Sequence, residues 1–132
     1  MEAFAAQQNH FENHVPETLR IRSNRQLLKI ILHNLIDNAN KYTSDGIVSV
    51  GGSQEGPAVR LVVSDTGPGL SGDLVNWINE SNAAYPESPD GEPRMHGIGL
   101  VIIKELTEIL GLEISVSSGH GTRFEILITN IL

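Results

Sequence analysis

Apolar residues recur every three or four positions between residues 24 and 43 (NRQLLKIILHNLIDNANKYT), a segment with neither Gly nor Pro. This spacing predicts a helix of about five turns, because residues three and four apart share a face. Ser23 or Asn24 is suited to cap its start, and the turn at residues 43–46 ends it. The expected core face consists of Leu28, Leu32, Leu35, Ile36 and Ala39. The expected solvent stripe consists of Gln26, Lys29, His33, Asp37 and Asn40.

A third stripe of this helix changes character along its length. It begins with apolar residues and ends with polar ones, in the order Leu27, Ile31, Asn34, Asn38, Lys41 and Tyr42. A buried amide without a partner costs roughly 1–3 kcal/mol, so the two asparagines need hydrogen-bonding groups around them. Those groups belong either to the protein or to a bound ligand, and the helix alone leaves both readings open.

Alternating apolar and polar residues predict strands elsewhere. The expected strands are Leu19–Arg22, Ile47–Gln54, Ala58–Asp65, Glu113–Ser118 and Arg123–Thr129, with a short edge strand over His10–Val15. A second helix is expected over Leu100–Leu110 with Gly111 after its end, and its core candidates are Val101, Ile102, Leu106, Ile109 and Leu110. One or two helical turns are expected over Asp73–Asn79.

Glycine pairs interrupt this pattern at residues 65–69 (DTGPG), 97–99 (GIG) and 119–121 (GHG). Each pair alone is compatible with a simple turn, although a glycine before a helix also leaves free N–H groups that can bind phosphate. Neither a Rossmann fingerprint nor a Walker loop is present. Residues 70–96 between the first two pairs are irregular and rich in proline, and a connection this long is usually functional or mobile.

Length and composition restrict the function. The 132 residues suit one domain spanning the whole chain, with residues 1–9 as a terminal segment. No apolar run is long enough to span a membrane and no signal peptide is visible, while the lack of cysteine fits the cytoplasm. A net charge of −7 argues against nucleic-acid binding. An anionic ligand would therefore need a nearby lysine, a helix N-terminus or a metal ion.

Together these segments resemble the catalytic ATP-binding domain of sensor histidine kinases, in the Bergerat-fold (GHKL) superfamily shared with DNA gyrase, MutL and the ninety-kilodalton heat-shock chaperone. Residues 33–43 (HNLIDNANKYT) resemble the N box, residues 65–69 the G1 box, residues 97–100 (GIGL) the G2 box, and residues 119–124 (GHGTRF) the last glycine turn. The match covers roughly residues 10–130. It implies an α/β two-layer sandwich, with a mixed, mainly antiparallel sheet of about five strands and helices on one face.

The resemblance also implies roles for individual residues. Asn38 would hold Mg²⁺ through its amide oxygen, and Asn34, one turn earlier, would orient water or phosphate in the catalytic step. Lys41 would supply positive charge to the phosphates of ATP, and Tyr42 would close the pocket beside it. Asp65 would accept a hydrogen bond from the adenine amino group.

The glycine motifs would bring backbone close to the nucleotide. Gly67 and Gly69 would let the chain approach the base, and Thr122 would add a hydroxyl near the adenine end. The amides of Gly97, Ile98, Gly99 and Leu100 would lie at the phosphates. Residues 70–96 would form a lid over ATP.

One position separates two activities of the superfamily. Its ATP hydrolases carry a glutamate one turn before the metal-binding asparagine, where this chain has Asn34, and an amide cannot act as a general base. We therefore expect transfer of the γ-phosphate to a protein histidine. The acceptor would lie on a dimerisation and phosphotransfer domain, and a response regulator receiver domain would act downstream. Neither nucleic acid nor direct membrane contact is expected.

The chain departs from the family pattern at several points. Met95 occupies the place of the first glycine of the G2 region, and no F box is recognisable among residues 70–96. No phosphoacceptor segment is recognisable either, so we expect a cytoplasmic catalytic fragment of a larger bacterial kinase, with or without a membrane anchor, that is inactive in autophosphorylation alone. Two alternatives remain: a degenerate nucleotide-binding module that regulates a partner by docking, and a serine kinase on the same fold.

Overall fold

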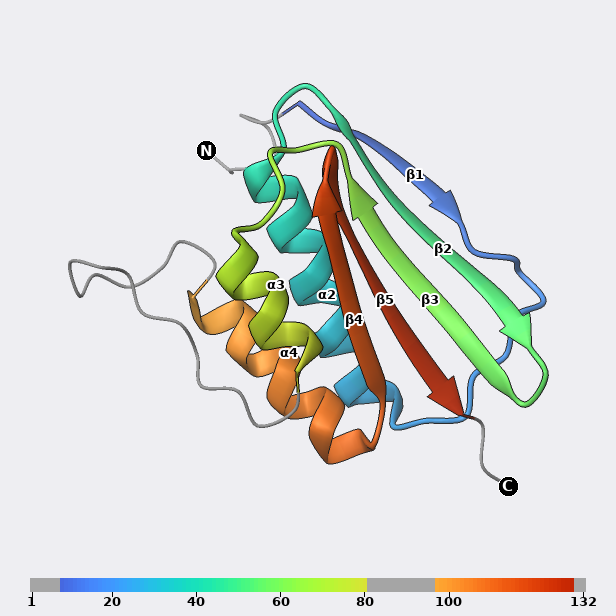
Figure 1. Ribbon diagram of the computed structural model, residues 1–132. Helices are drawn as coiled ribbons and strands as arrows, with labels where there is room; N and C mark the ends of the chain where they lie inside the picture. Colours follow the sequence, from blue (N-terminus) through green and yellow to red (C-terminus); the bar gives the residue numbers. More distant parts are fainter. Residues whose placement is uncertain (1–7, 81–96, 130–132) are drawn as a thin grey trace.

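The computed structural model describes residues 8–80 and 97–129. Within them the chain forms five strands and three helices, with the three helices against one face of the sheet (Figure 1). The strands are β1 (His10–His14), β2 (Ile47–Glu55), β3 (Ala58–Asp65), β4 (Glu113–Gly119) and β5 (Gly121–Thr129). The helices are α2 (Arg25–Tyr42), α3 (Gly72–Asn79) and α4 (Gly97–Leu110).

The sheet has the strand order β1-β2-β3-β5-β4. β1 runs parallel to β2, and every other neighbouring pair is antiparallel. This is the mixed, mainly antiparallel sheet that the sequence predicts, and the two-layer sandwich is confirmed. The register places Asp65 at the end of β3 opposite Val48 of β2 and Thr122 of β5.

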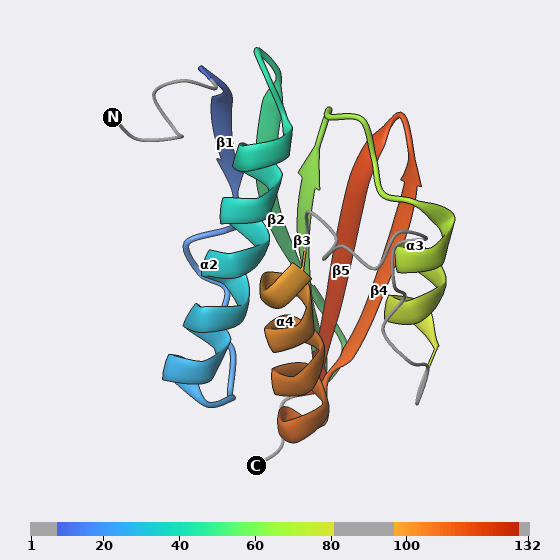
Figure 2. The same cartoon turned by 90° about the vertical axis from the view of Figure 1, so that its left-hand side faces the viewer.

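The core lies between the sheet and the helix layer (Figure 2). Strand residues that point toward the helices alternate with outward ones, as in Val59, Leu61 and Val63 of β3, which are all buried. On the helix side the fully buried side chains include Ile31, Leu35, Leu100 and Ile103. Each element therefore buries one face in a common core.

Helix α2 begins as the sequence predicts. The side chain of Asn24 caps it by accepting a hydrogen bond from the Leu27 amide, with an N···O distance of 3.0 Å. Leu28, Leu35 and Ala39 of the predicted core face are buried. Ile31 is also fully buried, whereas Leu32 and Ile36 are only partly so. The face that meets the sheet is thus turned toward the third stripe, which brings Asn38 closer to the core than an exposed position would.

Helix α4 differs from its predicted core face. Leu100, Ile103 and Thr107 are buried, whereas Ile102 and Ile109 are exposed, Ile109 with 71% of its surface. The i, i+3, i+7 line of buried residues turns Ile109 to the opposite side, so its assignment to the core was wrong. The helix end is confirmed: Gly111 has φ +67°, and the Leu112 amide donates to the Thr107 carbonyl at 2.8 Å.

The segment Leu19–Arg22 is not a strand, which corrects the sequence prediction. It forms an irregular connection whose apolar side chains, Leu19 and Ile21, pack against the core. Arg20 donates instead to the carbonyls of Glu17 and Leu19. The alternation of apolar and polar residues here belongs to a loop that packs its apolar side chains on the core, and not to a strand that pairs with a neighbour. Of the predicted lid, residues 72–79 form α3, and residues 81–96 lie outside the described part of the chain.

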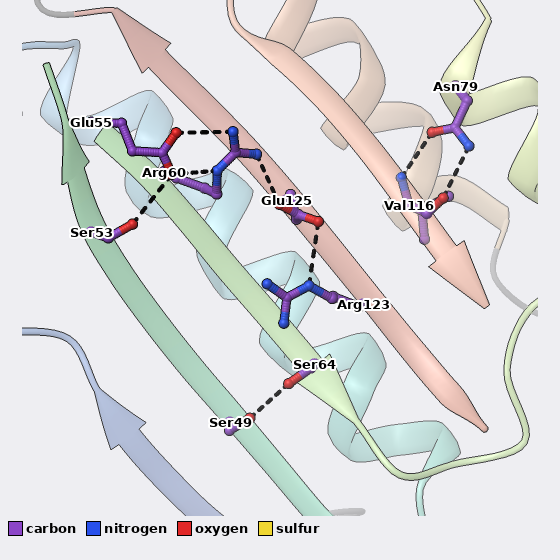
Figure 3. A network of polar contacts seen from close by, with 9 residues as sticks. All are labelled: Ser49, Ser53, Glu55, Arg60, Ser64, Asn79, Val116, Arg123 and Glu125. Carbon is purple, nitrogen blue, oxygen red and sulfur yellow. Dashed lines mark hydrogen bonds and ion pairs between the residues drawn. The ribbon is translucent and has the colours of Figure 1, made fainter. Parts of the chain in front are cut away.

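The face of the sheet that points away from the helices is polar (Figure 3). Arg60 on β3 contacts Glu55 at 2.7 Å and Glu125 on β5 at 2.8 Å, and Ser49 and Ser64 pair at 2.7 Å.

At the β4 edge, the Asn79 side chain of α3 donates to the Val116 carbonyl at 3.0 Å and accepts from its amide at 2.8 Å. One amide side chain thereby satisfies two backbone groups of an edge strand.

Candidate functional site

A pocket opens between the C-terminal half of α2, the end of β3 and the start of α4. Its cavity volume is about 20 Å³. Its lining residues come from every layer of the fold: Leu35, Asn38, Ala39, Tyr42, Val63, Asp65, Pro68, Gly69, Leu70, Leu100, Thr122 and Phe124. Four separate sequence motifs, at residues 33–43, 65–69, 97–100 and 119–124, thus meet at one cavity.

Helix α2 contributes the polar end of its third stripe to this pocket. Asn38 and Tyr42 line it, and Nδ2 of Asn38 is buried without a hydrogen-bond partner in the described part of the chain. A buried amide in this state is costly, which favours an additional polar group in the cavity. Asn34 is half-buried one turn earlier and Lys41 is exposed, and neither of them lines the pocket.

A residue that the sequence did not single out holds the end of α2. Nδ2 of Asn9, just before β1, lies 3.0 Å from the Asn40 carbonyl and 2.7 Å from the Thr43 carbonyl. Oδ1 of Asn9 accepts from the Gly46 amide at 3.0 Å. The last turn of α2, and with it Tyr42, is therefore fixed by a side chain more than thirty positions away in sequence. Asn40, expected to face solvent, takes part in this contact.

The glycine loop after β3 folds around Asp65. Oδ1 of Asp65 accepts a hydrogen bond from the Gly67 amide at 2.8 Å, which bends the chain back toward the carboxylate. A methyl group on Gly67 would lie 2.8 Å from Oγ1 of Thr43 and 2.9 Å from the Tyr42 carbonyl. Gly67 therefore allows the loop to pack directly against the end of α2, although it does not itself line the pocket.

The start of α4 packs beside the Asn38 amide. A methyl group on Gly99 would lie 3.5 Å from Nδ2 and 3.6 Å from Oδ1 of Asn38. Leu100, with 1% of its surface exposed, closes the pocket on this side. Gly97 and Ile98 form the first positions of α4, and the side chain of Ile98 lies outside the description.

The sheet supplies the apolar floor and one hydroxyl. Thr122 is buried opposite Asp65, and Val63 and Phe124 lie beside it. Phe124, Leu35 and Ala39 were not predicted as site residues. Their inward positions, two or three residues from predicted site residues on the same element, were the available signal. The structure thus gathers Asn38, Tyr42, Asp65, Gly69, Leu100 and Thr122 around one cavity, while their roles stay predictions.

A buried lysine fastens the neighbouring helices to each other. Nζ of Lys104 on α4 donates to the Trp77 carbonyl and, at 2.6 Å, to the Glu80 carbonyl at the end of α3. It also lies 4.9 Å from the centre of the Trp77 ring. Burial lowers the pKa of Lys104 below its usual value, against the opposing effect of Glu108 and Glu80. The cation thus serves as a cap for α3.

The pocket combines apolar side chains with a carboxylate, an amide and a hydroxyl, the mixture of groups that small-molecule sites use. A family model described as "Histidine kinase-, DNA gyrase B-, and HSP90-like ATPase" matches residues 23–130. The chain belongs to this family. Its members' ATP-binding fold, expected from the four motifs, is therefore established for this histidine kinase-like ATPase domain, and the candidate pocket lies within the matched residues.

Curated relatives of the domain are sensor kinases. An uncharacterized sensor-like histidine kinase of Rhizobium meliloti is 32% identical over 110 residues, which cover 83% of this chain and 21% of that protein. The sensor protein GacS of Pseudomonas syringae is 37% identical over 104 residues, which cover 74% of this chain and 12% of that protein. The chain therefore spans about a fifth or less of these relatives.

Solved structures of histidine kinases share the fold. The catalytic domain of histidine kinase ThkA has a TM-score of 0.75 at 21% identity, covering 96% of this chain and 83% of that one. Full-length ShkA in complex with AMPPNP has a TM-score of 0.74 at 28% identity, covering 96% of this chain and 27% of that one. Among the described helices of the present domain, none is long and apolar enough to cross a membrane.

Proposed function

We propose that this domain binds ATP with Mg²⁺ in the pocket between α2, β3 and α4 and donates the γ-phosphate to a histidine on a partner domain. The observation that carries the proposal is the meeting of Asn38, Asp65 and Thr122 at one cavity. The family to which the chain belongs, and its kinase relatives, support the same activity. The similar ShkA structure holds an ATP analogue, AMPPNP.

The adenine would lie at the Asp65 end of the pocket. One oxygen of Asp65 accepts from the Gly67 amide, which fixes the carboxylate plane. A carboxylate is an acceptor only, so it favours the amino group of adenine over the carbonyl of guanine. Thr122 on β5 pairs with Asp65 on the neighbouring strand β3 and would add a hydroxyl. The apolar side chains of the pocket would pack against the face of the base.

The phosphates would lie toward the start of α4. The amides that open this helix, at Gly97, Ile98, Gly99 and Leu100, suit phosphate binding. The unpartnered atom of Asn38 is Nδ2, a donor that suits a phosphate oxygen, and Oδ1 of the same amide would be the atom that binds Mg²⁺, which takes oxygen ligands. Bound Mg²⁺ would supply charge neutralisation there. The exposed Lys41, next to the pocket residue Tyr42 in the sequence, would add a positive charge.

The asparagine at position 34 favours transfer of the γ-phosphate to a protein over hydrolysis of ATP. An amide such as Asn34 can orient a water molecule or a phosphate oxygen but cannot take up its proton as a base at neutral pH. The acceptor would be a histidine on a dimerisation domain of the same kinase, and a receiver domain would take the phosphate next. In-line transfer needs an acceptor nitrogen about 3–3.5 Å from the reacting phosphorus.

A labelling experiment tests this proposal. ATP labelled in its γ-phosphate is incubated with the domain alone and then with the domain fused to a dimerisation and histidine-bearing segment. We expect labelling of that segment only in the fusion, with loss of labelling in Asn38→Ala and retention in the surface control Asn76→Ala. Strong labelling of the isolated domain, removed by replacing His10 or His14, would contradict the proposal. Absence of nucleotide binding would favour a regulatory docking module instead, and label on a partner serine would favour the serine kinase.

A further inference from the structure

Ser118 lies at the end of β4, next to the pocket but not among its lining residues. Its Oγ accepts a hydrogen bond from the Leu70 amide, with an N···O distance of 2.8 Å. The Leu70 carbonyl, at 3.4 Å, and the Gly121 carbonyl, at 3.5 Å, are the acceptors available to its hydroxyl proton. One small side chain therefore joins the glycine loop, the end of β4 and the start of β5.

The glycine loop at residues 65–69 and the turn between β4 and β5 lie so close that side chains on their glycines would collide with the opposite segment. Gly69 has φ +87°, and a methyl group on it would lie 2.5 Å from Oγ of Ser118. Gly121 has φ +100°, and a methyl group on it would lie 2.1 Å from the Asp65 carbonyl. The absence of side chains at Gly69 and Gly121 therefore lets the glycine loop approach Ser118 and the start of β5 closely.

Leu70, whose amide donates to Ser118, lies where the glycine loop leads into α3. Gly69 and Leu70 line the pocket, and the next residue, Ser71, caps α3 by accepting from the Leu74 amide at 3.3 Å. Leu70 precedes the helix, so its amide takes no part in helical hydrogen bonding. Without the hydroxyl of Ser118, the loop would lose the side-chain partner that fixes this corner.

We propose that Ser118 is a positioning residue for nucleotide binding. Its hydroxyl holds Gly69 and Leu70 in the conformation that shapes the adenine end of the pocket. This inference rests on the proposed function, because it assigns the loop to the nucleotide. Loss of one hydrogen bond of this kind is worth roughly 0.5–1.5 kcal/mol, which corresponds to an affinity loss of about threefold to tenfold.

The test compares Ser118→Ala with two matched variants. Ser118→Thr keeps the hydroxyl at an exposed position, and Ser115→Ala removes a hydroxyl from an exposed site on the same strand. Amide hydrogen exchange of Leu70, followed by NMR in the protein without nucleotide, reports on the hydrogen bond itself. Calorimetric titration with ADP reports on affinity, and thermal unfolding reports on general stability.

We expect Ser118→Ala to accelerate exchange at Leu70 and to weaken ADP binding about threefold to tenfold, with both other variants close to the parent chain. Unchanged exchange at Leu70 would overturn the inference. Faster exchange with unchanged ADP affinity would also overturn it, since the contact would then be structural only. If the parent chain binds no ADP at all, the proposed function fails together with this role, whereas parent binding that Ser118→Ala leaves intact removes the inference alone.

Discussion

Asp65 places a carboxylate in a pocket whose other lining side chains are apolar, amide or hydroxyl-bearing. Its Oδ1 is already engaged by the Gly67 amide, so the group is oriented before any ligand arrives. Preorganised acceptors of this kind lose little on binding, because the cost of ordering them is met during folding. Replacing an acceptor oxygen of Asp65 with a donor therefore tests which ligand the pocket selects.

Replacement of Asp65 by Asn tests the adenine contact. The variant keeps an oxygen for the Gly67 amide but replaces the second acceptor with a donor. We expect a folded protein whose ATP affinity falls by about tenfold or more, since hydrogen bonds to charged groups contribute roughly 1.5–3 kcal/mol. Calorimetry measures the affinity, and Asp73→Asn in α3, outside the pocket, is the control. Unchanged ATP affinity in folded Asp65→Asn would refute the assignment.

Gly67→Ala tests how tightly the loop packs on α2. The added methyl group would meet Thr43 and the Tyr42 carbonyl at less than 3.0 Å, and the carbonyl cannot move without shifting the helix end. We expect the free energy of unfolding to fall by about 1–3 kcal/mol, as for other overpacked sites. The control Gly72→Ala meets no atom within 4 Å and begins a helix, so it should be neutral or stabilising. Urea unfolding distinguishes them, and equal effects would contradict this reading of the loop.

Single residues also show how far the sequence could predict the site. Asn38, Asp65 and Thr122 belong to local motifs, so their meeting at a pocket could be expected from the chain alone. Asn9 and Ser118 could not, because their contacts join positions 31 to 48 residues apart and depend on the exact packing of two backbones. No local pattern marks an asparagine or a serine as a bridge of this kind.

Among the elements, α3 is the one whose position depends most visibly on polar contacts. Asn79 ties its end to the edge strand β4, and Lys104 ties it to α4. Both contacts lie at the last turn, directly before residues 81–96, which the structure does not describe. The sequence predicted one or two turns here but gave no indication of the contact with Lys104, because that contact joins two helices that are far apart in the sequence.

The buried Lys104 predicts a pH dependence of stability. Burial lowers the pKa of Lys104 below 10.5, so between the lowered value and 10.5 the unfolded chain binds more protons than the folded one. The contribution of Lys104 to the free energy of unfolding should therefore rise as pH increases through this window and be smallest below it. Urea unfolding of the parent chain and Lys104→Met from neutral pH to 10.5 measures the difference. Lys29→Met, at an exposed site, corrects for the lost charge, and a difference that shrinks with rising pH would contradict the prediction.

Two elements show why pattern alone was insufficient. The segment Leu19–Arg22 has the alternation of a strand, yet it pairs with none, because β1 already occupies the edge beside β2. In α4 the apolar residues surround much of the helix, so periodicity could not decide which line faces the sheet; packing against α2 and the sheet selected Leu100, Ile103 and Thr107. Helix and strand types followed from the sequence, whereas pairings and burial depended on competition between elements.

At the scale of the whole molecule, the domain presents one covered and one open sheet face, with its pocket at the edge of the helix layer. It corresponds to about a fifth or less of the kinases that it resembles. Binding of nucleotide is thus the part of the proposed activity that this chain should perform by itself, and phosphate transfer is the part that needs a partner.

The most direct test of the account is calorimetric titration of the folded domain with ATP, with and without Mg²⁺. We predict binding of one nucleotide per chain that weakens when Mg²⁺ is withheld from the parent protein, because the Asn38 amide then has no metal to engage. In Asn38→Ala, whose fold is checked by circular dichroism, the dependence on Mg²⁺ should disappear. A correctly folded parent domain that binds no ATP in the presence of Mg²⁺ would contradict the central claim.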